Sequence, residues 1–176
     1  RVRFDFPAGA DDACPLFVGR LIRGVTNGPS PRWLQDRLLA VGLRPISALV
    51  DITNFFTIDR CRPLHVFDAD LITGSLTVRL SRPGETLAAL NDKSYTLEEG
   101  MTVIADEDGV ASLGAVIGGS ATGCSAETTS VFVECALFDP VRTAATGRRL
   151  GIDSDARYRF ERGLDPDAVF TGIEQA

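Results

Sequence analysis

The sequence predicts an α+β domain with a strand-rich core of mixed or antiparallel sheet layers and flanking helices. The chain has 176 residues, of which 44% are hydrophobic, enough to bury one core without disulfides or metals. Short β-rich segments separated by turn signals fill its middle, and helical patterns lie before and after them. This order, without an internal repeat, disfavours alternating βαβ units.

The first 60 residues are predicted to form one strand and two helices. Residues 14–25 are β-rich, with the imperfect alternation of a strand covered on both sides. Ser30 is a good N-cap residue and the proline after it suits the first helical turn, so a helix is expected up to Gly42. Residues 47–59 fit a second helix capped by Ser47, although their β-branched side chains leave a strand open.

From residue 63 the texture changes to short strands separated by turns. The segments predicted as strands are LHVF, SLTVRLS, ETLAAL, KSYTL, MTVIAD, VASLGAVIGG and SVFVECALF. The tail from Asp139 onward is predicted to be helical or irregular, with Gly151 and Gly163 as helix stops.

The chain is expected to hold a short lead-in, residues 1–12, and a single domain over residues 13–176 that is cut from a longer polypeptide. No apolar stretch approaches the ~18 to 20 residues that span a bilayer, so no membrane partner is expected. The four cysteines lack the paired spacing of a zinc site or disulfide framework. They indicate reduced thiols in a cytoplasmic protein.

The charge excludes one broad class of function. A net charge of −6 disfavours a nucleic-acid coat held by global positive charge. However, arginines crowd the last quarter of the chain, so a local site for phosphate remains open.

Glu134 is the most informative single residue. In a strand VFVECALF it shares one face with Phe132, Ala136 and Phe138, and that face is otherwise apolar. A buried carboxylate without a partner costs several kcal/mol, so Glu134 is paired with a cation, kept for a ligand, or on the solvent side of an edge strand. Spacing alone favours the first and the last of these explanations, in which Glu134 has no ligand.

His65 is the only histidine and the natural proton carrier near neutral pH. A lone histidine is more often structural. The sequence has no Gly-x-Ser-x-Gly elbow, and one histidine with scattered carboxylates makes a poor metal site. Hydrolysis by water or simple binding are the functions left open, without a metal.

Two further clusters are ambiguous. The glycine-rich run 114–123 lacks the lysine of a phosphate-binding loop, so its glycines are expected to let the backbone pass close to a ligand or another strand. In residues 151–163 arginines and aromatics interleave as in some nucleic-acid sites. A solvated Arg/Glu ladder on a short helix is about equally good an explanation.

Several separated stretches together resemble one family. They are GPSPRWLQ with GLRP, LVDITNF, RPLHVFDAD, IGG, VECALF and SDARYRFERGLDP. In this order, over nearly the whole chain, they resemble the editing domain of the bacterial phenylalanyl-tRNA synthetase beta subunit.

The resemblance implies a class II synthetase whose alpha subunit aminoacylates tRNA(Phe), with ATP and Mg²⁺ used by the whole α2β2 enzyme and no cofactor in this domain. It implies that this domain clears tyrosine wrongly attached to tRNA(Phe), with tyrosine as its ligand. The resemblance assigns Glu134 to recognition of the tyrosine hydroxyl. It places the following residues in the same pocket, the first three as catalytic and the rest as substrate-binding: His65, Thr53, Asn54, Arg44, Gly118, Ser154 and Ala156.

Physical reasoning supports such a second site. An apolar pocket rejects a substrate that only adds a hydroxyl by roughly 10²-fold, which is too little for translation. A buried acceptor reverses the preference, because phenylalanine leaves it unpaired.

Many relatives have Ala-Gly where this chain has Gly114-Ala115, which puts the backbone approach to the ligand in question. An inactive scaffolding or tRNA-guiding module and a freestanding deacylase are the alternatives.

Overall fold

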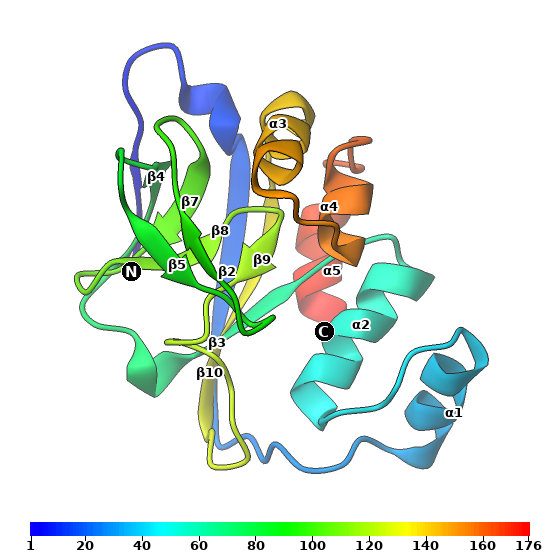
Figure 1. Ribbon diagram of the computed structural model, residues 1–176. Helices are drawn as coiled ribbons and strands as arrows, with labels where there is room; N and C mark the ends of the chain where they lie inside the picture. Colours follow the sequence, from blue (N-terminus) through cyan, green and yellow to red (C-terminus); the bar gives the residue numbers. More distant parts are fainter.

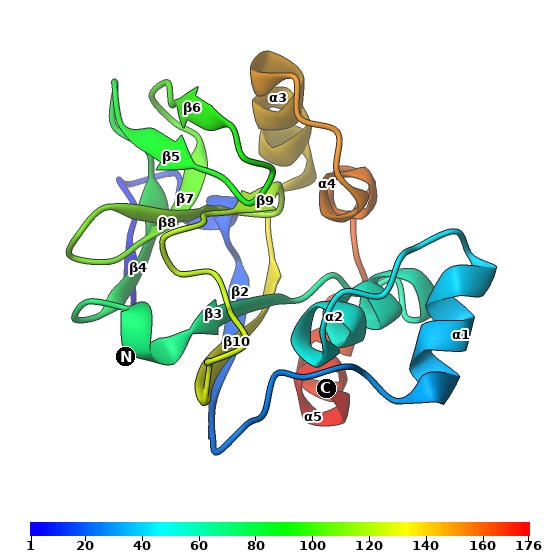
Figure 2. The same cartoon turned by 60° about the horizontal axis from the view of Figure 1, so that its bottom comes forward.

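The computed structural model describes all residues from Arg1 to Ala176. It contains three sheets and five α-helices, which confirms the predicted α+β class. The helices gather on one side of the strands, and the chain begins on the sheet side and ends among the helices (Figures 1 and 2).

The strands form a mixed five-stranded sheet, a three-stranded antiparallel sheet and a hairpin. The five-stranded sheet has the order β1 (Val2–Asp5), β4 (Leu76–Leu80), β7 (Thr102–Ala105), β8 (Val110–Leu113) and β9 (Ile117–Gly118). The three-stranded sheet has the order β2 (Leu16–Arg23), β10 (Ser130–Leu137) and β3 (His65–Asp68). The hairpin consists of β5 (Thr86–Ala88) and β6 (Ser94–Thr96). Each strand-like segment of the sequence therefore contributes to a sheet.

Strand β1 lies inside the segment that the sequence treats as a lead-in. Residues 2–5 pair in parallel with residues 76–79 of β4, so the segment forms one edge of the five-stranded sheet. All other pairs in the molecule are antiparallel. The segment does show a strand pattern: Val2, Phe4 and Phe6 alternate with Arg3 and Asp5 before the turn signal Pro7-Ala-Gly, and treating it as a lead-in overlooked this alternation.

The central strand β10 separates two layers of the core. Phe132, Ala136 and Phe138 pack with the five-stranded sheet, in a cluster that includes Val78 and Ile104. Val131, Val133 and Cys135 pack against α5 on the opposite face. The alternation predicted for SVFVECALF is confirmed, and it makes Glu134 the polar member of the inter-sheet face.

The helices are α1 (Arg32–Ala40), α2 (Ala48–Asp59), α3 (Pro140–Leu150), α4 (Asp155–Phe160) and α5 (Ala168–Gln175), with short 3-10 turns at Asp11–Ala13 and Ala69–Leu71. The helical interpretation of residues 47–59 is confirmed and the strand alternative is wrong. Gly151 adopts φ +63° at the end of α3, and Gly163 adopts φ +84° after α4, as predicted. None of the helices has the length and apolar character needed to cross a membrane.

The capping prediction is wrong for Ser30 and right in position for Ser47. Helix α1 begins one residue later than predicted, with Pro31 at its N-cap. Ser47 occupies the N-cap of α2, but its side chain makes no capping hydrogen bond. The Ser30 hydroxyl donates instead to Asp51 Oδ2 at 2.5 Å, and the backbone N–H of Ile46 donates to Asp51 Oδ1 at 2.8 Å. Asp51 is fully buried in the first turn of α2, and Ser30, one residue before the N-cap of α1, is one of its two hydrogen-bond donors.

Candidate functional site

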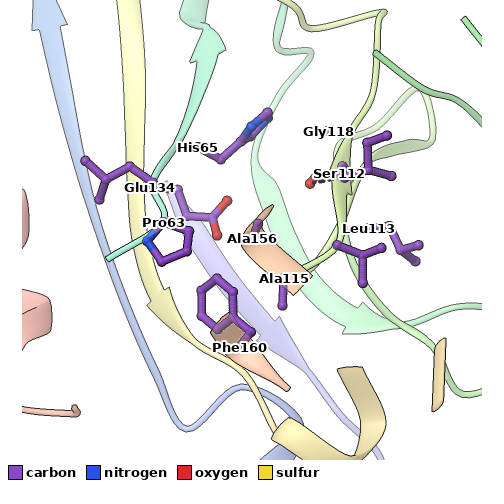
Figure 3. Close-up of a pocket in the computed structure, with 12 residues that line it drawn as sticks. Pro63, His65, Ser112, Leu113, Ala115, Gly118, Glu134, Ala156 and Phe160 are labelled. Atoms are coloured by element: carbon purple, nitrogen blue, oxygen red, sulfur yellow. Dashed lines mark hydrogen bonds between the residues drawn. The ribbon is translucent and has the colours of Figure 1, made fainter. Parts of the chain in front are cut away.

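A cavity of about 70 Å³ lies between the two larger sheets and α4. Figure 3 shows side chains from β3, β10, β8, β9 and α4 converging on it. It is lined by Pro63, Leu64, His65, Ser112, Leu113, Ala115, Val116, Ile117, Gly118, Glu134, Ala156 and Phe160. Most of this lining is apolar, with Glu134 and His65 as its titratable groups.

Glu134 and His65 are cross-strand neighbours. They occupy opposed positions in the antiparallel pair of β10 and β3, so both side chains stand on the same face of the three-stranded sheet. Figure 3 shows both directed into the cavity. Residues almost 70 positions apart in the sequence are thus brought together by strand register alone.

The Glu134 carboxyl is buried without full compensation. The residue is 6% exposed, and its Oε2 atom has no hydrogen-bond partner. Burial raises the pKa of Glu134 to about 8, because the charged form has lost its water. At pH 7 the group is therefore mainly a neutral carboxylic acid, which can both donate and accept a hydrogen bond.

The His65 imidazole is also buried and neutral. Its ring meets the ring of Phe67 edge to face, with centroids 4.3 Å apart, and its Nε2 atom has no partner. Burial lowers the pKa of His65 to about 4. At neutral pH the histidine can hold or orient a water molecule, but it carries no positive charge to pair with Glu134.

Gly118 and Gly119 allow close packing beside His65. A Cβ atom on Gly118 would lie 2.2 Å from His65 Cε1, and one on Gly119 would lie 2.6 Å from the carbonyl oxygen of Ala111. The prediction that these glycines permit close approach to another strand is confirmed. The space beside Gly118 is taken by the imidazole, and Gly118 also lines the cavity.

The Gly114-Ala115 pair has its own geometry. Ala115 lines the cavity with φ +64°, a left-handed conformation that glycine adopts at lower cost. A Cβ atom on Gly114 would lie 2.7 Å from the Phe138 ring. The order of the two residues is therefore fitted to Phe138 at the cost of strain at Ala115.

Helix α4 forms one wall of the cavity through Ala156 and Phe160. Ser154 stands at its N-cap: its Oγ accepts from the backbone N–H of Arg157 at 3.1 Å and donates to the carbonyl oxygen of Val116 at 2.7 Å. Ser154 thus ties the helix to the β8–β9 turn and does not itself line the cavity. Its position supports a structural role next to the site.

Besides Ser154, three residues that the resemblance assigns to the pocket lie outside this cavity. Thr53 and Asn54 are half-buried on α2, and Arg44 is exposed in the loop before it. The Thr53 hydroxyl donates to the carbonyl oxygen of Val50 at 2.8 Å, within its own helix. Of the predicted site residues, the structure brings together Glu134, His65, Gly118 and Ala156.

The arginine-rich segment is largely an Arg/acid ladder. Arg157 pairs with Glu161 at 3.0 Å and Arg159 with Asp155 at 2.8 Å, each one helical turn apart. Arg162 also contacts Glu161 at 3.0 Å. This structural explanation, left open by the sequence, accounts for most of the charge on α4.

The cavity does not fit ATP with Mg²⁺. No lysine or arginine lines it to take phosphates, and it offers one carboxyl and one imidazole as possible metal ligands. Across the chain no three His, Cys, Asp or Glu side chains gather as a metal site would require.

The sequence analysis did not predict most of the cavity lining, because residues such as Pro63, Ser112 and Phe160 carry no motif of their own.

The fold and cavity define a B3/4 domain. The model of that family matches residues 13–176, and the chain belongs to it. Its relatives include the phenylalanine–tRNA ligase beta subunits of Paramagnetospirillum magneticum, 64% identical over 99% of this chain, and of Ruegeria pomeroyi, 60% identical over 94%. They confirm the resemblance to the synthetase beta subunit. The chain spans about a fifth of their length, 22% and 21% respectively.

A solved structure shows the same fold. An N-terminal fragment of the phenylalanyl-tRNA synthetase beta subunit from Pyrococcus horikoshii matches with a TM-score of 0.55 and 16% identity. The match covers 85% of this chain and 49% of that fragment.

Proposed function

We propose that this domain hydrolyses the ester of tyrosine wrongly attached to tRNA(Phe), as part of a phenylalanyl-tRNA synthetase beta subunit that works with an alpha subunit. The observation that carries the proposal is the pair of unpartnered buried polar groups, Glu134 and His65, on adjacent strands of one apolar cavity. Relatives named as beta subunits of this ligase supply the substrate class.

Glu134 supplies selectivity for tyrosine over phenylalanine. The carboxyl is already buried in the free protein, so the free-energy cost of removing its water belongs to folding and not to ligand binding. A tyrosine hydroxyl then gains a hydrogen bond, while a phenylalanine ring leaves Oε2 unpaired as before. Because Glu134 is mainly neutral at pH 7, the gain is that of a neutral hydrogen bond, about 1 kcal/mol.

His65 supplies a polar contact at the reacting end. Its neutral imidazole, with Nε2 free of protein partners, can accept a hydrogen bond from a water molecule or from a ribose hydroxyl. With a pKa of about 4 it is a weak base, so it suits orienting a water molecule better than removing its proton completely. The attacking water adds to the ester carbonyl, and the ribose oxygen leaves with a proton.

The proposal is tested by deacylation of Tyr-tRNA(Phe) and Phe-tRNA(Phe) with the complete synthetase and its Glu134→Ala variant. Loss of one neutral hydrogen bond is expected to reduce the tyrosine preference roughly five-fold. Glu174→Ala, which removes an exposed carboxylate on α5, is the matched control and is expected to keep the wild-type preference. Melting curves show whether each variant is folded.

Unchanged selectivity in a folded Glu134→Ala enzyme would refute the assignment of Glu134. If the wild-type synthetase hydrolyses neither ester, the domain is instead a scaffold or a guide for the tRNA.

A further inference from the structure

A row of opposed residues crosses the five-stranded sheet from β1 to β9. The strand register places these residues side by side: Phe4, Val78, Ile104, Ser112 and Gly118. Val78 and Ile104 lie in the core between the two larger sheets. Because opposed residues of paired strands stand on the same face, Ser112 belongs to that inner face, and it is the polar side chain of the row.

Ser112 lies across the cavity from Glu134. Both residues line the cavity, and Figure 3 shows them on opposite walls, Glu134 from β10 and Ser112 from β8. Glu134 is the polar member of its face of β10, as Ser112 is of its row. Each of two largely apolar strand faces therefore contributes one polar group to the same space.

The Ser112 hydroxyl is buried and poorly satisfied. The residue is 4% exposed, and its Oγ donates to the carbonyl oxygen of Ile117 at 3.4 Å. A good O–H···O hydrogen bond is shorter, at roughly 2.5 to 3.0 Å. No protein group donates to this Oγ, although a hydroxyl oxygen can accept hydrogen bonds as well as donate one.

Ser81 shows the contacts of a buried serine that stabilises the fold. It is 3% exposed, and its Oγ donates to the carbonyl oxygen of Glu98 at 2.5 Å and accepts from the backbone N–H of Met101 at 2.9 Å. Ser112 is buried to the same extent but has neither an acceptor at such a distance nor a donor. Its hydroxyl therefore retains hydrogen-bonding capacity for a molecule in the cavity.

We propose that Ser112 is a second recognition residue for the tyrosine hydroxyl, which it contacts together with Glu134. The Ser112 hydroxyl donates to the phenol oxygen, while the phenol O–H donates to Oε2 of Glu134, the oxygen without a partner. This inference rests on the proposed function, since it requires a tyrosyl side chain in the cavity. A phenylalanine ring offers neither a donor nor an acceptor, so both protein groups stay unpaired.

The test measures deacylation of Tyr-tRNA(Phe) and Phe-tRNA(Phe) by the complete synthetase and its Ser112→Ala variant. Loss of one neutral hydrogen bond is expected to lower kcat/KM for the tyrosyl ester between about 2- and 13-fold, without lowering that for the phenylalanyl ester. Ser81→Ala is the matched control. It is expected to lower Tm more than Ser112→Ala does, because it breaks two good hydrogen bonds, and to keep the wild-type preference.

A double variant tests whether the two residues contact the same hydroxyl. If they do, Ser112→Ala combined with Glu134→Ala is expected to lose less tyrosine preference than the product of the two single losses. A loss equal to that product would overturn the shared contact.

An unchanged tyrosine preference in a folded Ser112→Ala enzyme would overturn the proposal in favour of a structural bond to Ile117. Equal losses for both esters would also overturn it, because Ser112 would then act on a group common to both, such as the attacking water.

Amide analogues of the tyrosyl- and phenylalanyl-adenosine ends, which lack the ester, separate recognition from hydrolysis. The wild-type synthetase is expected to bind the tyrosyl amide more tightly than Ser112→Ala does. This result in an enzyme that hydrolyses neither ester would support the recognition role and refute only the hydrolytic function.

Discussion

Two buried acidic side chains, Asp51 and Glu134, differ in how their oxygens are satisfied. Asp51 has no exposed surface, and its two oxygens accept hydrogen bonds from the Ser30 hydroxyl and the Ile46 backbone N–H. Glu134 is 6% exposed, and its Oε2 has no partner. Asp51 joins the α1–α2 connection to the first turn of α2, whereas Glu134 faces a cavity.

The comparison shows that burial of a carboxyl group does not by itself mark a site. A third case, Asp68, supports the distinction: its oxygens accept from the Asp70 backbone N–H at 3.0 Å and the Thr128 hydroxyl at 2.6 Å. Where both oxygens are satisfied, the group stabilises the fold. Where one is left open beside a cavity, the protein retains hydrogen-bonding capacity for a ligand.

The strongest test of this comparison replaces each carboxyl by its amide. Asp51→Asn turns one acceptor into a donor facing a hydroxyl or an N–H, and we expect it to destabilise the fold by about 2 to 3 kcal/mol. Glu134→Gln replaces a group that is mainly neutral at pH 7, and we expect a change below about 1 kcal/mol. Thermal unfolding of both variants at pH 7 measures the difference, and equal destabilisation would contradict it.

The pH dependence of stability gives a second test. The pKa of Glu134 rises from 4.5 to about 8 on folding, so the folded state holds more protons and stability falls as the pH rises between these values. The pKa of His65 falls from 6.5 to about 4 on folding, so the unfolded state holds more protons between these values. The stability that His65 contributes therefore rises with pH from about 4 to 6.5 and is complete above 6.5.

Between pH 6.5 and 8, Glu134 therefore acts without His65. We expect the wild type to lose stability relative to Glu134→Gln across this window, by no more than about 1.4 kcal/mol per pH unit. Melting curves of both proteins at several pH values provide the measurement. A constant difference from pH 6.5 to 8 would show that Glu134 does not titrate there.

The smallest expected effect concerns backbone strain at the cavity, which the Asp51 region lacks. Ala115 has φ +64°, and glycine relieves the clash of its Cβ atom there. We expect Ala115→Gly to stabilise the fold by up to about 1 kcal/mol, reduced by the greater freedom of glycine in the unfolded chain. Clear destabilisation in a melting curve would mean that the Ala115 methyl group packs more favourably than its conformation costs.

Local patterns in the sequence predicted most elements and one decisive face. Period-2 alternation in β10 placed Glu134 among Phe132, Ala136 and Phe138, because side chains alternate across a strand wherever it pairs. Glycines with positive φ marked the ends of α3 and α4 for an equally local reason. Strand β1 was missed although Val2, Phe4 and Phe6 alternate with charged residues, and its pairing with β4, more than 70 positions away, shows that it belongs to the sheet.

The sequence by itself determined most strands, most helix ends and the family, since these depend on short-range periodicity and on strings of specific residues. Only the tertiary structure decided that Glu134 and His65 are neighbours, because strand register is set by packing across the whole sheet. It also decided the protonation of both groups, since a pKa depends on the burial that distant segments create. It likewise decided that the Ser30 hydroxyl donates to the buried Asp51 side chain, because that contact joins residues 21 positions apart and no local pattern predicts it.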